Sequence, residues 1–208
     1  MNATATKCVF AGILLAGGAV FANDPPRKRA AAAKAVKADE GASLMVAMEK
    51  LAAPGESHKR LRAEVGTWTA KIRSWMGAGP PVESTGISVV KSIFDGRFIE
   101  EDYTATVMGK PFSGHGIVGY DNARKKFVSA WVDSMGTGIM LSEGTADASG
   151  QTITSDATHM NPLTGQPQLV RTVDRIASDT ERVVEFFDQE ADGKETRVME
   201  IIYTKSRQ

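Results

Sequence analysis

The sequence predicts an all-β antiparallel protein of about ten strands. From Thr67 onward, apolar and polar residues alternate with a period of two, which is typical of strands with one covered face. Turn-forming pairs such as Asp95-Gly96, Asp121-Asn122 and Asp192-Gly193 recur about every ten positions, as in antiparallel sandwiches and barrels. The connections are therefore short, and consecutive strands are expected to pair.

The last strand adds information on the shape of the sheet, because neither of its faces is purely polar. Val198, Glu200 and Ile202 oppose a face that carries Arg197, Met199, Ile201 and Tyr203. Mixed polarity on both faces is typical of a small closed barrel with a semi-polar interior. We expect strands at 67–76, 82–94, 97–108, 111–121, 126–134, 138–147, 151–159, 168–177, 181–189 and 195–204.

The first 22 residues have the layout of a signal peptide. Lys7 precedes an apolar run from Cys8 to Phe21, and small residues follow, with Val20 and Ala22 placed for cleavage after Ala22. The run is too short to span a bilayer comfortably. We therefore expect an exported bacterial protein, periplasmic or secreted, and the alternative is an uncleaved N-terminal anchor.

Export would leave a chain without a thiol and with little net charge. Cys8, the only cysteine, lies in the leader, so no disulfide, thiolate nucleophile or cysteine-based metal site is expected. Loss of Lys7 leaves 24 basic residues against 25 acidic ones, which is not the footprint of a nucleic-acid binder. No later apolar run is long enough to cross a membrane, so no transmembrane segment is expected after cleavage.

Three regions are expected along the chain: the signal peptide 1–22, a linker 23–54 and a β-domain 55–208. The linker is rich in Ala and Lys and carries a basic cluster at 27–29. We interpret it as a solvated tether, with contact to anionic lipid or peptidoglycan as the alternative. A short helix is possible over Ala42–Leu51, and Pro54–Ser57 begins a second one that continues to Gly66.

Several segments together resemble a known family. They are the helix followed by Gly66-Thr67-Trp68, then 119-GYDNARKKFVSAWVDSM-135, 143-EGTADASGQTIT-154, 161-NPLTGQ-166 and 192-DGKETRVMEIIYTK-205. The first is similar to the Gly-x-Trp entry of lipocalin-like (calycin) barrels, and the set is similar to a bacterial family of secreted or cytoplasmic domains of unknown function. The resemblance covers about residues 56–205. It implies a calycin-like barrel of about ten strands with a short helix at one end, and no established reaction.

Catalytic and metal motifs are weak in this sequence. The histidines at 58, 115 and 159 lie more than forty residues apart, so a metal site would require the fold to bring them together. Ser134 follows Asp133 but lacks a Gly-x-Ser-x-Gly motif, and 114-GHGIVG-119 lacks the following helix that would hold phosphate. We expect those glycines to permit bending of a barrel strand, where a missing side chain allows a kink or close packing. Glu100 and Asp102 should share a solvated strand face, with Glu101 on the other.

The stretch 127-FVSAWVDSMGTGIM-140 carries the strongest functional hypothesis. Phe127, Ser129 and Trp131 share one strand face that ends at Asp133, an aromatic platform with a polar rim of the kind that lines small-molecule sites. The alternative is that the tryptophans are core residues. Candidate residues for a small or lipid-like ligand are Trp68, His115, Tyr120, Trp131, Asp133, Met135 and Arg171.

Two other functions remain open at this point. One is an enzyme acting through His115, His159, Glu143 and Asp133 on a small substrate, and the other is an envelope assembly module that binds a protein. No cofactor is indicated. The oligomeric state and the presence of a cavity are left open by the sequence.

Overall fold

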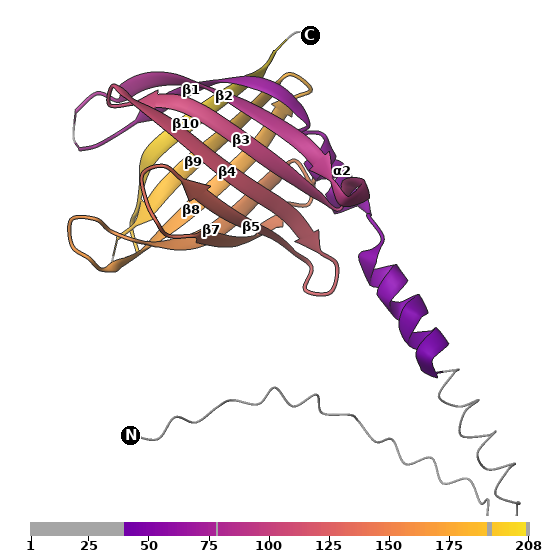
Figure 1. The fold of residues 1–208 in the computed structure, drawn as a ribbon. Coiled ribbons are helices and arrows are strands. Elements are labelled where there is room, and N and C mark those ends of the chain that lie inside the picture. The colour runs from indigo at the N-terminus through magenta and orange to yellow at the C-terminus, as the bar shows by residue number, and fades with distance from the viewer. Residues whose placement is uncertain (1–39, 78, 191–192, 207–208) are drawn as a thin grey trace, which may run out of the picture. The chain divides into compact units, whose positions relative to one another are not determined.

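A computed structural model describes residues 40–77, 79–190 and 193–206, which fold mainly as one antiparallel barrel (Figure 1). In these residues, helix α2 (Glu56–Arg62) precedes ten strands, and the 3₁₀ turn η1 (Phe94–Gly96) joins the second strand to the third. The strands are β1 (Gly66–Ser74), β2 (Val82–Ile93), β3 (Phe98–Val107), β4 (Lys110–Asp121), β5 (Lys126–Asp133), β6 (Met140–Ala146), β7 (Thr152–Met160), β8 (Pro167–Ser178), β9 (Glu181–Gln189) and β10 (Glu195–Lys205).

Every strand pairs with its neighbours in sequence, and β1 pairs with β10 to close the barrel. All ten pairings are antiparallel, with register shifts in β8 near Ile176 and in β10 near Arg197. Closure leaves none of these strands with an unpaired edge. Because the connections are all hairpins, the barrel has two ends, each formed by alternate loops.

The sequence prediction of an all-β barrel of about ten strands with a short helix is confirmed. Each predicted strand overlaps an observed one, and the ends differ by at most two residues. The expected helix after Pro54 is α2, which ends at Arg62, earlier than expected. The predicted signal peptide and most of the predicted linker lie outside the described residues.

The chain divides into two units, Met1–Ala47 and Met48–Gln208. The helix expected over Ala42–Leu51 spans residues 40–52 and exposes Leu44, Met45, Val46, Met48 and Leu51 to solvent. In the second unit, Asn122 donates to the carbonyl oxygens of Leu51 and Ala53 at 2.7 and 2.9 Å. Among the described helices, none has the length and apolar character needed to span a bilayer.

Helix α2 covers one end of the barrel, which we call the closed end. Its Leu61 is 1% exposed and joins the core, while the helix contacts β3, β4 and η1. His58 is buried as well, accepts a hydrogen bond at Nδ1 from the Gly55 amide, and meets Tyr120 edge to face. Burial, reinforced by the charge of Arg62, lowers the pKa of His58. The neutral imidazole is therefore part of the packing that fixes the helix.

An ionic cluster joins the segment after α2 to the far side of the barrel. Arg182 of β9 donates to Glu64 at 2.5 Å and lies 3.3 Å from Asp174 of β8, and Arg60 pairs with both carboxylates. The four side chains balance in charge, and the Arg182 guanidinium also stacks on the Tyr203 ring at 4.5 Å. The cluster thus fixes the helical segment across the closed end.

Burial makes the charges in this cluster depend on one another. It raises the pKa of Glu64 to about 7, with the nearby Asp174 acting in the same direction and Arg182 and Arg60 opposing it. The Glu64 carbonyl also accepts a hydrogen bond of 2.7 Å from the Trp68 indole at the start of β1. Glu64 therefore connects α2 to both the first strand and the ninth.

We predict that Arg182→Met destabilises the barrel in a pH-dependent way. The substitution leaves Glu64 and Asp174 facing Arg60 alone, which should cost about 3 to 5 kcal/mol near about pH 8. Without Arg182 the pKa of Glu64 rises further. The pH range in which Glu64 is protonated in the native state but ionised in the unfolded state therefore becomes wider. The stability of the variant then falls more steeply than that of the wild type as pH rises above about 7, and the loss should shrink as pH is lowered toward about 7, below which Glu64 is protonated in both proteins. Urea unfolding across this range measures the loss.

Arg175→Met is the matched control, since Arg175 lies exposed on the neighbouring strand β8, directly after Asp174. Its effect should stay within about 0.5 kcal/mol at every pH. An Arg182→Met variant that matches this control would contradict the stabilising role of the cluster.

Candidate functional site

The inner wall of the barrel is buried toward the closed end. Strand register identifies the inward side chains, because residues paired across antiparallel strands point to the same face. Those near α2 are almost inaccessible and form the main core with Leu61; they include Trp68, Val90, Ile99, Phe127, Ile153 and Val184. This half of the barrel is packed like an ordinary protein interior.

The other half of the inner wall is accessible to solvent. Inward side chains there are only partly buried, although they point into a closed barrel; they include Phe112, Trp131, Met140, Ser142, Thr172 and Phe186. Their side chains border the inner space of the barrel. We call this inner space the lumen, and its open end the mouth, where the loops β1–β2, β3–β4, β5–β6, β7–β8 and β9–β10 lie.

Tyr103 separates the packed half from the lumen. Its ring lies 6.1 to 6.4 Å, centroid to centroid, from those of Phe112, Trp131 and Tyr203, in edge-to-face arrangements. The side chain packs over Gly86 of β2, where a Cβ would lie 2.8 Å from its hydroxyl. Burial, followed by the charge of Glu101, raises the pKa of Tyr103 well above its usual range. The floor of the lumen is therefore aromatic, and the Tyr103 phenol in it is neutral.

The Trp131 indole lies flat against β4, because glycines of that strand leave room for it. A Cβ at Gly114 would lie 2.2 Å from the indole, and one at Gly116 would lie 2.9 Å from it. The indole nitrogen donates to Asp133 at 3.0 Å, and the other oxygen of Asp133 accepts from the Met135 amide. The expectation that glycines in 114-GHGIVG-119 permit close packing is thus confirmed.

Polar groups are spaced along the lumen wall. The Ser129 and Ser142 hydroxyls bond to each other at 2.6 Å, and Ser88 donates to Glu101 at 2.6 Å. His159 also points inward, and its Nε2 is buried without a hydrogen-bond partner. Such a group gains a partner only if a ligand or water supplies one.

The structure separates the seven candidate residues into four locations. Trp131 and Asp133 face the lumen, and Met135 projects from the β5–β6 loop at the mouth. Trp68 and Tyr120 point inward at the closed end, in or against the packed core. His115 and Arg171 lie on the outer face: His115 contacts Asp102 at 2.8 Å, and Arg171 pairs with Asp156 and Glu195. Only the first three therefore belong to one site.

The groups considered for catalysis are not brought together either. Of the enzyme set, Asp133 and His159 face inward, whereas His115 and Glu143 lie outside, where Glu143 pairs with Arg124. The Ser134 hydroxyl accepts from the Ser113 amide at 3.1 Å. In the part of the chain that the structure describes, no group of three or more His, Cys, Asp or Glu side chains could hold a metal ion.

The acidic run in β3 follows the predicted alternation. Glu101 points inward, while Glu100 and Asp102 point outward. The hydrogen bond from His115, more than any charge nearby, lowers the pKa of Asp102.

Sequence reasoning missed several lumen residues. Phe112, Met140, Phe186 and Met199 face the lumen or the core beneath it, and His159 was considered only for a metal site and for catalysis. The alternation that placed Trp131 inward also applies to their strands. What the sequence lacked was the register, which shows that these positions lie at the level of Trp131 rather than at the level of Trp68.

Two surface hollows lie apart from the lumen. One of about 380 Å³ lies over β1, β2 and β10, where most of its lining side chains, such as Lys71 and Thr85, point outward. Another of about 180 Å³ adjoins the ionic cluster and is lined by Glu64, Arg182 and Lys205 among others. Neither includes the Trp131–Asp133 pair.

These features define a closed antiparallel β-barrel that is packed at the end under α2 and has partly buried inward side chains toward the other end. The chain belongs to the family described as protein of unknown function (DUF1579), whose model matches residues 53–205. Among proteins with curated descriptions, none matches the chain.

Two solved structures have a similar fold. The crystal structure of Rv2717c from M. tuberculosis aligns with a TM-score of 0.56 at 15% identity, covering 74% of this chain and 100% of that one. The S-type phycobiliprotein lyase CPES from Guillardia theta aligns with a TM-score of 0.55 at 11% identity, covering 77% of this chain and 98% of that one. At these identities the similarity concerns the fold alone.

We predict that Gly114→Ala destabilises the protein and disturbs Trp131. The added methyl group overlaps the indole, and overpacking of this kind costs about 1 to 3 kcal/mol. Chemical denaturation measures the loss, and near-ultraviolet circular dichroism should report a changed tryptophan environment. Gly138→Ala is the control, since no atom lies within 4 Å of its added Cβ. Equal stability of the two variants would refute the packing argument.

Proposed function

We propose that this protein binds a small, partly apolar ligand in the lumen of a calycin-like barrel. The observation that carries the proposal is the incomplete burial of inward side chains in the mouth half of a closed barrel. A core built only for stability would bury them, as the closed end buries its own. The exposed inner wall is therefore surface available to a ligand.

The composition of this wall favours a ligand with both apolar and polar parts. Phe112, Trp131 and Phe186 offer apolar area, which supplies most of the affinity in small-molecule sites. Asp133, already aligned with the Trp131 indole, and the unpartnered Nε2 of His159 offer hydrogen bonds that would orient the ligand. Met135 would lie at the entrance.

The cellular setting remains part of the proposal. The leader-like residues 1–22 support export, so we infer that the ligand is met outside the cytoplasm. One barrel of similar fold is named a phycobiliprotein lyase, which is compatible with a fold that acts on another molecule.

A matched pair of substitutions on β6 tests lumen binding. Ser142 points inward and Leu141 points outward, so Ser142→Trp should fill the lumen while Leu141→Trp should leave it open. The probe is the neutral fluorophore N-phenyl-1-naphthylamine. We expect saturable binding to the wild type, an affinity on the order of tenfold lower for Ser142→Trp, and no change for Leu141→Trp. Circular dichroism checks that both variants fold.

Native mass spectrometry of the exported chain, purified without detergent, extends the test to a natural ligand. The expected result is an added mass that disappears on denaturation and is absent from Ser142→Trp. Two outcomes would reject the proposal: a wild type that neither binds the probe nor carries added mass, or variants that bind equally.

A further inference from the structure

The two ends of the barrel differ in charge. Every loop at the closed end carries charged residues, in the stretches 94-FDGR-97, 121-DNARKK-126, 147-DASGQ-151 and 178-SDTE-181. Three of the mouth loops carry no charged residue, over 75–82, 134–141 and 161–167. The β3–β4 turn carries one charged residue, Lys110. This is a strong contrast in a chain of which 24% is charged.

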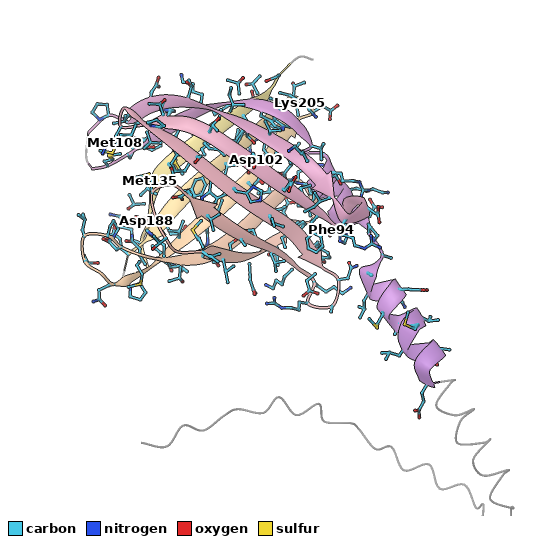
Figure 2. The ribbon with its side chains drawn as sticks, in the orientation of Figure 1. Phe94, Asp102, Met108, Met135, Asp188 and Lys205 are labelled. Atoms are coloured by element: carbon cyan, nitrogen blue, oxygen red, sulfur yellow. The ribbon has the colours of Figure 1, made fainter. Side chains whose placement is uncertain are left out.

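The uncharged mouth loops also expose large apolar side chains. Within the described residues, those at least 60% exposed on these four loops or at their ends are Met76, Met108, Met135, Ile139, Leu141, Met160 and Leu163, which we call the rim. Leu163 is 94% exposed at the tip of the β7–β8 loop. Figure 2 shows Met108 and Met135 at the mouth and Phe94 at the opposite end. At the closed end, the comparable exposed apolar side chain is Phe94, which is 71% exposed.

A rim of this composition is suited to an uncharged apolar medium. Contiguous exposed apolar groups on soluble proteins mark binding surfaces. Here the groups stand on separate loops around an opening, so a rigid partner could not pack against them as one continuous surface. The methionines of the rim are unbranched and adaptable, which suits a fluid environment.

The outer face of the barrel next to the rim has the composition of a membrane interface. Trp75, just after β1, lies between the guanidinium groups of Arg73 and Arg197, at 5.2 and 4.6 Å from its ring. Tryptophan and arginine are favoured at the level of lipid headgroups, where an apolar body meets polar surroundings. Arg73 and Arg197 both pair with Glu200, and Arg197 also pairs with Glu185, so the two positive charges face two carboxylates.

From these observations we propose that the mouth docks on a lipid surface, with the rim inserted among the acyl chains. The β9–β10 loop, which carries Glu190 and Glu195, stays on the water side, so the barrel docks tilted. Because the rim is uncharged, docking does not require anionic lipid. The proposal is independent of whether the lumen holds a ligand, but it places the mouth in contact with an apolar phase.

The test uses the full chain with Cys8→Ser and a single cysteine at one of two positions. Leu163→Cys places an environment-sensitive nitrobenzoxadiazole label on the rim, and Phe94→Cys places it on the exposed apolar position at the closed end. With phosphatidylcholine vesicles, the label at 163 should increase in emission several-fold and shift to the blue, while the label at 94 should change little. The response should survive high salt, which screens charge attraction.

Vesicle flotation with unlabelled protein adds a second measurement. Met135→Ser combined with Leu163→Ser should lower the partition coefficient on the order of tenfold or more, whereas Phe94→Ser should not. Every variant keeps the N-terminal apolar run and the helix over 40–52, so any attachment through them is common to all. If that attachment obscures flotation differences, the label at 163 still reports insertion.

Three results would overturn the proposal. One is a label at 163 that does not respond to vesicles, and another is an equal response at 163 and 94. The third is a blue shift at 163 that rises with protein concentration in the absence of lipid, which would assign the rim to a second copy of the chain.

Discussion

The buried ionic cluster of Arg60, Glu64, Asp174 and Arg182 determines how the two ends of this barrel differ. It connects the segment after α2 with β8 and β9, while the Glu64 carbonyl holds the Trp68 indole of β1. Removal of four charged side chains from water costs desolvation energy, which their ion pairs offset, although within the described part of the chain Asp174 Oδ1 and Arg182 Nε have no hydrogen-bond partner. The cluster thus fixes one arrangement of the helix, and that arrangement closes one end only.

Aromatic side chains above glycines extend this asymmetry along the barrel. Tyr103 packs on Gly86, and Trp131 packs on Gly114 and Gly116, so that large rings lie flat against the wall instead of filling the centre. A ring held against the wall leaves space in front of it. This explains how a barrel with so many inward aromatics can be packed at one end and accessible at the other.

Much of this fold could be predicted from the sequence, because its signals are local. Period-two alternation and the Asp-Gly and Asp-Asn turns gave the strands, and alternation also placed Glu101 opposite Glu100 and Asp102. The site was harder to predict. Alternation cannot tell the inward face of a strand from its outward face when both faces carry polar and apolar residues. His115 and Arg171 were therefore chosen for their chemistry, although the register places them on the outer wall.

The position of a residue along the barrel axis was the other missing quantity. Trp68 and Trp131 both point inward and are similar in sequence context, yet one belongs to the core and the other to the lumen. Only the pairing of distant strands, and the helix that covers one end, distinguish them. The ionic cluster was also beyond prediction, since Glu64 and Arg182 lie 118 positions apart.

Hydroxyl-radical footprinting of the two inward tryptophans, read by mass spectrometry, tests the central claim most directly. Trp68 is 3% exposed at the closed end, whereas Trp131 is only partly buried on the lumen wall. Our account predicts that Trp131 is oxidised much faster than Trp68, because solvent enters the mouth half. Equal protection of the two indoles would mean that the barrel is packed throughout and that no accessible lumen exists.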